Sequence, residues 1–120
     1  MIYLLAALAA LMGAAGVVSA AAAAHASANP LLGTISHMLM IHAAAVLGLL
    51  AFGRGGPFQL WYGVVAALML AGVALFSVDL AARIWLGGRL FPFAAPLGGG
   101  LTIFAWVSAA GVSIVAMFRA

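Results

Sequence analysis

The chain has 120 residues, of which 69% are hydrophobic and only 4% charged, whereas about a quarter of the residues in a soluble domain carry charge. Its net charge of +3 comes from four scattered basic residues, all arginine, with no run that could follow a phosphate backbone, which excludes nucleic-acid binding. Cysteine is absent, so disulfides, thiol nucleophiles and thiolate metal sites are excluded together.

Three short breaks divide the chain into four apolar stretches, and about 20 apolar residues suffice to cross a bilayer. We therefore predict an all-α membrane protein whose four transmembrane helices form a compact up-down bundle, as a single domain over residues 1–120. The expected helices cover residues of about 2–24, 34–52, 58–86 and 99–118. An even number of spans places both termini on the same side of the membrane. The distribution of the arginines favours a cytoplasmic location for both termini.

Small residues recur at spacings of three and four along the first stretch, and they are Ala6, Ala9, Gly13, Gly16, Ala20 and Ala23. Larger side chains, among them Leu4, Leu8 and Leu11, fall on the other side of the helix. In lipid, small residues favour helix association because they let backbones approach closely. The pattern predicts a first helix that packs at the centre of the bundle.

The first stretch has an alternative interpretation as a signal peptide, since Ala26-Ser27-Ala28 resembles a small-residue cleavage site after an apolar core. Against this, no basic residue precedes the apolar run, and the run is longer than a signal-peptide core. Asn29-Pro30 then ends the first helix region, because proline restricts the residue before it and suits a new helix start.

Glycine and proline mark the two later breaks. The cluster Gly53–Pro57 ends the second helix, and Gly87-Gly88-Arg89 ends the third. The triple glycine Gly98–Gly100 is costly inside a helix. We therefore expect the fourth helix to begin near it, and we expect the glycines to allow close approach of a neighbouring backbone.

Four stretches resemble the small four-helix membrane proteins grouped as domain-of-unknown-function family 423. They read AHA at 24–26, HAAA at 42–45, LFSVDL at 75–80 and FPFAAPLGG at 91–99. The resemblance implies a four-helix fold in a bacterial membrane and supplies no activity. The family usually has a tyrosine and another polar residue before the histidine of the second helix, where this chain has Met38-Leu39-Met40-Ile41.

Asp79 and Arg83 are four residues apart in the third expected helix, so they lie on one face and can pair. Their functional interpretation is a site that handles protons or a ligand. The structural interpretation, which we favour, is a pair near the interface that anchors the helix end.

Histidines offer the other candidates for chemistry. His42 lies about 16 Å along the second helix, close to the midplane, where an ionisable residue is either functional or bonded to a neighbouring helix. His37 and His42 point to different faces and cannot together hold a metal ion, so we predict no metal site and no cofactor. For a haem, His25 and His37 would be the least unsuitable pair.

The up-down topology brings one group of residues to the rim opposite the termini. This candidate polar rim, interpreted as structural or as a binding site, consists of His25, Ser36, His37, Asp79, Arg83, Pro92, Pro96, Gly98 and Gly99. We expect Asp79 to stay ionised by pairing with Arg83, and to accept a further hydrogen bond from the first or second helix, because an unpaired carboxylate in hydrocarbon is costly.

The sequence thus favours a non-enzymatic protein of the bacterial inner membrane. Its partners would be the lipid bilayer and either a larger membrane complex, to which it is an accessory subunit, or a second copy of itself. Two alternatives stay open. One is a proton- or ion-coupled carrier that uses His42, Asp79 and Arg83, and the other is a haem-bearing electron-transfer subunit.

Overall fold

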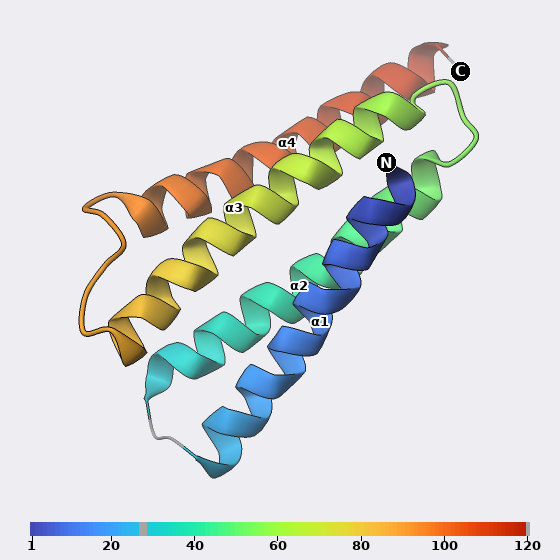
Figure 1. Cartoon of the computed structure of the whole chain (residues 1–120). Helices are drawn as coiled ribbons and strands as arrows, with labels where there is room; N and C mark the ends of the chain where they lie inside the picture. Colours follow the sequence, from blue (N-terminus) through green and yellow to red (C-terminus); the bar gives the residue numbers. More distant parts are fainter. Residues whose placement is uncertain (27–28, 120) are drawn as a thin grey trace.

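Four long helices make up almost the whole protein in the computed structural model, which describes residues 1–26 and 29–119. They are α1 (Ile2–His25), α2 (Pro30–Gly53), α3 (Gln59–Trp85) and α4 (Ala94–Arg119). All four are long and apolar enough to cross a membrane. They alternate in direction, so that both termini lie at one end of the bundle (Figure 1). The predicted all-α fold with four transmembrane helices is confirmed, and the protein is a multi-pass integral membrane protein.

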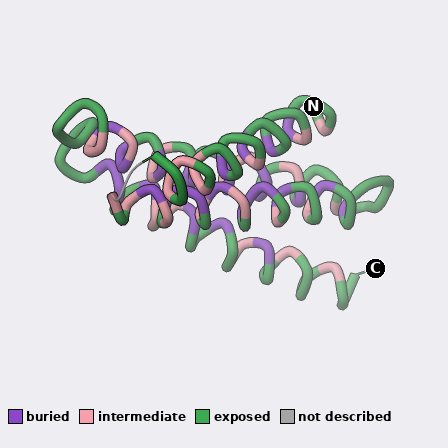
Figure 2. Tube along the Cα trace, turned by 90° about the horizontal axis from the view of Figure 1, so that it is seen from below, coloured by how far each residue is buried: buried purple, intermediate pink, exposed green. Residues whose placement is uncertain are grey.

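The helices pack in chain order. α1 packs on α2, α2 on α3 and α3 on α4, while α1 touches α3 over a short stretch only. The two central helices are therefore α2 and α3, and the prediction of a central α1 is wrong. In Figure 2 the C-terminal part of α4 lies at the edge of the molecule, and no described residue of α4 after Ala109 is buried.

The small-residue ridge of α1 does face the protein, as predicted. Ala9 and Gly16 are buried, whereas Leu4, Leu8 and Leu11 are exposed. A Cβ atom added at Gly16 would lie 3.0 Å from the backbone nitrogen of Met40 in α2. The packing of α1 is mainly against α2, which leaves α1 at the edge of the bundle.

α2 begins at Pro30, four residues before the predicted start at 34. The Oδ1 atom of Asn29 accepts a hydrogen bond from the backbone N–H of Leu31 at 3.0 Å, so Asn29 caps the helix. Proline fits the first position because the N–H it lacks would have no partner there. The alternative cleavage segment Ala26–Ala28 falls partly outside the described residues.

α4 begins at Ala94, five residues before the predicted start at 99. Pro96 lies in the first turn, where no N–H is needed, and the helix continues through the glycines. A Cβ atom added at Gly98 would lie 2.6 Å from the nitrogen of Phe76 and 2.7 Å from the carbonyl oxygen of Gly72. The predicted close approach is confirmed at Gly98, and the packing it allows offsets the helix cost of glycine.

Candidate functional site

Asp79 is the one acidic residue of the sequence, and its side chain is fully buried, with 0% exposed. Its Oδ2 atom accepts a hydrogen bond from Nη2 of Arg83 at 2.8 Å. Its Oδ1 atom accepts another from the backbone N–H of Leu90, also at 2.8 Å. The pairing predicted from the spacing is present, but the further donor is Leu90 in the α3–α4 connection, not a group of α1 or α2. Asp79 therefore fastens the end of α3 to the connection that follows it.

Arg83 and Arg89 lie beside this carboxylate. Arg89 donates from Nη1 to the carbonyl oxygen of Pro92 at 3.1 Å, which holds the connection in a second place. Both arginines line a hollow of about 440 Å³ between α3 and α4, together with Pro96 and Gly99 of the first turns of α4. The hollow thus combines two positive charges with a lining that is otherwise apolar.

The structure divides the candidate polar rim into two parts. One part lies in the hairpin of α3 and α4, and it consists of Asp79, Arg83, Pro92, Pro96, Gly98 and Gly99. His25 and His37 are exposed and Ser36 is buried, and within residues 1–26 and 29–119 no hydrogen bond or ion pair joins these three to Asp79.

His42 has both ring nitrogens bonded and is only 7% exposed. Its Nδ1 atom lies 2.7 Å from the carbonyl oxygen of Met38, and because a carbonyl only accepts, Nδ1 carries the proton. Nε2 accepts a hydrogen bond from Nε1 of Trp106 at 3.1 Å. The arrangement requires the neutral ring, and it joins α2 to α4.

Sequence reasoning missed Trp106, although a signal was present. His42 and Trp106 each lie about 18 Å from the start of their helices, which begin at the same rim, so the two side chains share one depth. A tryptophan at that depth needs an acceptor for its N–H.

A second missed pair is Tyr62 and Ser113, whose hydroxyl oxygens are 2.9 Å apart and join α3 to α4 nearer the termini.

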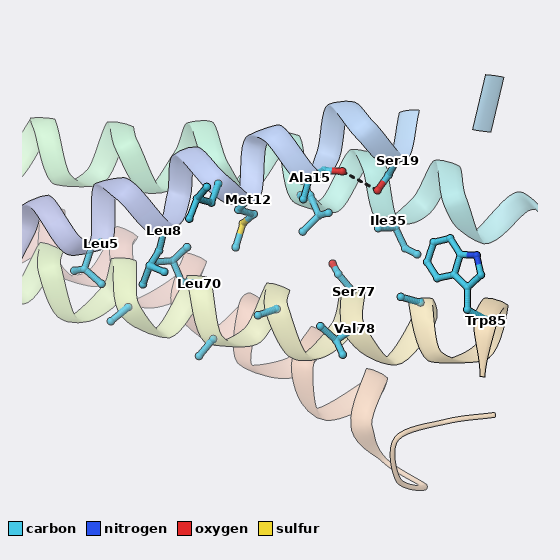
Figure 3. A pocket seen from close by; sticks show the side chains of 16 residues that line it. Leu5, Leu8, Met12, Ala15, Ser19, Ile35, Leu70, Ser77, Val78 and Trp85 are labelled. Atoms are coloured by element: carbon cyan, nitrogen blue, oxygen red, sulfur yellow. Dashed lines mark hydrogen bonds between the residues drawn. The ribbon is translucent and has the colours of Figure 1, made fainter. Parts of the chain in front are cut away.

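An apolar groove of about 660 Å³ runs between α1 and α3, with α2 as its floor (Figure 3). Leu8, Leu11 and Met12 line it from α1. From α3, small or short side chains at spacings of three and four line most of it, and they are Ala67, Ala71, Ala74, Val78 and Ala81, with the larger Leu70 among them. Trp85 lies at one end of the groove.

Two hydroxyl groups face this groove, and they differ in their bonding. Ser19 donates to the carbonyl oxygen of Ala15 at 2.8 Å, in its own helix. Ser77 is only 4% exposed, and its Oγ atom finds no hydrogen-bond partner in the described part of the chain. Figure 3 shows this oxygen pointing away from α3, toward the side where α1 and α2 lie. A buried hydroxyl without a partner is unfavourable and calls for an explanation.

The described residues contain no group of three or more metal-ligating side chains. No curated protein and no solved structure matches the chain. Residues 12–99 match the family described as "Protein of unknown function (DUF423)". That match covers more than half of the chain and includes all four stretches on which the resemblance depends, so the chain belongs to the DUF423 family.

Proposed function

We propose that this protein is a non-enzymatic accessory subunit of the bacterial inner membrane, and that its α1–α3 groove receives a transmembrane helix of a larger membrane complex. The observation that carries the proposal is the apolar groove itself, lined by leucines of α1 and alanines of α3. The Ser77 hydroxyl lies buried in its wall without a partner among the described residues. Ser19, Thr102 and Ser113 each donate to the carbonyl four residues earlier in their own helix. Ser77 does not, which leaves its hydroxyl free for a partner that rearranges the groove wall.

Two candidate residues within the spans, Asp79 and His42, support a structural protein over a catalyst. Asp79 uses both carboxylate oxygens, and His42 uses both ring nitrogens, in bonds within the chain. A general acid or base must reach the proton it transfers. Groups already engaged in holding helices together are poorly placed for that role.

A helix suits the groove better than a lipid chain does. Between Leu5 and Ser19 the groove is about 21 Å long, which is most of the hydrocarbon thickness. The alanines of α3 let another backbone approach closely. A saturated acyl chain offers no atom to Ser77, whereas a helix offers a polar side chain or a carbonyl oxygen.

The occupant is a helix of a different chain. A symmetric dimer would place the same surface of both copies face to face, and two concave grooves cannot fill one another. A head-to-tail contact between copies must either close into a ring or extend into a filament. The symmetric contact is therefore unfavourable, and the mass of a crosslinked adduct distinguishes a head-to-tail copy from a different chain.

Cysteine crosslinking in native membranes tests the proposal, since the chain has no cysteine of its own. An Ala74→Cys variant, with its thiol in the groove, should form one adduct with a different membrane protein. The matched control, Ala110→Cys on the exposed side of α4, should not form it. An adduct with the mass of two copies of this chain, or no adduct, would contradict the proposal.

Ser77→Ala separates binding from folding. In the isolated protein this change removes an unpartnered hydroxyl, so thermal stability should stay the same or rise. Crosslinking through Ala74→Cys should meanwhile fall by about fivefold, as expected for one hydrogen bond between helices in a membrane. A loss of stability in the isolated protein without a loss of crosslinking would show that Ser77 serves the fold alone.

The carrier and haem alternatives make different demands. A carrier would have to release His42, Asp79 or Arg83 from the bonds described above during each cycle. Reconstitution in vesicles with a pH-sensitive dye would detect proton flux. An absorbance scan of the purified protein would detect a haem.

A further inference from the structure

The hollow between α3 and α4 lies on the other side of α3 from the helix groove, and its lining changes character with depth. Arg83 and Arg89 are at its outer end. Phe76 and Ile103 lie deeper, and Phe76 is about 10 Å below Arg83 along α3. Gly99 and Gly100 form the wall between the two ends. A ligand that fits must carry negative charge at one end and hydrocarbon at the other.

Charge at the outer end is available for a ligand. The single carboxylate nearby, that of Asp79, already accepts from Arg83 and Leu90. Arg83 donates one hydrogen bond to Asp79 and Arg89 donates one to Pro92, although each guanidinium has five N–H donors. The Arg83 side chain is 28% exposed, so the outer part of its guanidinium group can reach a ligand in the hollow. The two arginines carry two positive charges and Asp79 carries one negative charge, so the net charge at the hollow is positive.

The depth of the arginines matches that of lipid headgroups. Arg83 is two residues before the end of α3 at Trp85, and Arg89 lies in the connection that follows. The side chain of Trp85, at this end of α3, is exposed, and amphipathic tryptophan rings mark the interface of a bilayer. Glycerol and the upper part of an acyl chain would then lie against Gly99, Gly100 and Ile103.

We propose that this hollow binds one anionic phospholipid, with its phosphate on Arg83 and Arg89 and one acyl chain along the glycine wall of α4. Arginine favours phosphate because its planar donors match two phosphate oxygens. The open side of Gly100, where an added Cβ would meet no atom within 4 Å, gives the chain its path.

Native mass spectrometry of the detergent-purified protein tests this site, with phosphatidylglycerol and phosphatidylcholine as probes. We expect one phosphatidylglycerol molecule to be retained in preference to phosphatidylcholine. Arg89→Gln should weaken this retention by about fivefold, the effect of one basic side chain near an anionic lipid. Arg54→Gln, at the opposite rim, is the matched control and should leave it unchanged.

A second pair of variants tests the acyl path without changing charge. Gly100→Leu fills the hollow and should reduce phosphatidylglycerol retention, while Gly48→Leu, on an equally open part of α2, should not. Equal retention of both lipids, or equal losses in Arg89→Gln and Arg54→Gln, would overturn the proposal. Displacement of the lipid by millimolar inorganic phosphate, with no effect of Gly100→Leu, would show a site for free phosphate and overturn it as well.

Discussion

The indole N–H of Trp106 in α4 donates to Nε2 of His42 in α2, 3.1 Å away, and so links two helices that are not neighbours in the packing order. The two rings meet edge to face, with centroids 5.9 Å apart. The bond fixes the side chain of His42 from one side while Met38 fixes it from the other. His42 is thereby bonded both within α2 and to α4.

Removal of the indole donor should weaken this link. Trp106→Phe keeps a ring but leaves Nε2 of His42 without its partner, so we expect the free energy of unfolding to fall by about 1 kcal/mol. Chemical unfolding in detergent micelles would measure it. Trp61→Phe, which changes an exposed indole, should have no such effect. Equal stability of the two variants would mean that the bond contributes nothing.

Substitution of Asp79 should free the α3–α4 connection. Asp79→Ala removes the acceptor of both Arg83 and Leu90, and we expect a loss of about 3 kcal/mol, as for a broken buried ion pair. Asp79→Asn keeps an oxygen that accepts from Leu90, so its free energy of unfolding should fall by less. Arg83→Ala should also lower the free energy of unfolding by less, because the bond to Leu90 stays and the carboxyl can take up a proton.

Hydrogen exchange at the Leu90 amide distinguishes these variants. The amide should be protected in the wild type, in Asp79→Asn and in Arg83→Ala, and should exchange rapidly in Asp79→Ala. Protection that survives Asp79→Ala would show that the carboxylate does not hold the connection.

The glycines of α4 should differ sharply in their tolerance of a methyl group. Gly98→Ala would place its Cβ atom within 2.7 Å of two backbone atoms of α3, so the helices must separate, at a cost of about 1–3 kcal/mol. Gly100→Ala meets no atom within 4 Å and should stabilise the helix by up to about 1 kcal/mol. Thermal unfolding in detergent compares the two, and the reverse order would exclude a tight α3–α4 contact.

Single cysteines can report the orientation in the membrane. Gly56→Cys lies in the connection between α2 and α3, at the rim of the termini, and Gly88→Cys lies at the opposite rim. The first rim is expected to be cytoplasmic, because positive charge is in excess on that side of a membrane and this rim carries Arg54, Arg119 and the amino terminus. A membrane-impermeant maleimide added to intact cells should therefore label Gly88→Cys alone. Labelling of Gly56→Cys alone would reverse the orientation.

The sequence was sufficient for the helices and for contacts within one helix. Hydropathy and length determine the four spans, and the i to i+4 spacing brings Arg83 to Asp79. The predicted start of α4 is too late for two reasons. Pro96 lies in the first turn, where a proline does not break a helix, and the contacts of Gly98 with α3 offset the helix cost of glycine. Contacts between helices were harder to predict, since the Leu90 donor and the edge position of α1 depend on which faces meet, and nearly every face is apolar.

The chain-order packing has a consequence for how the protein is made. Each new helix that enters the bilayer finds its main partner, the helix before it, already there. Contacts between helices that are not consecutive in the chain are few, so α1 can bury its ridge against α2 before α4 is made. The order of synthesis therefore coincides with the order in which the bundle can be built.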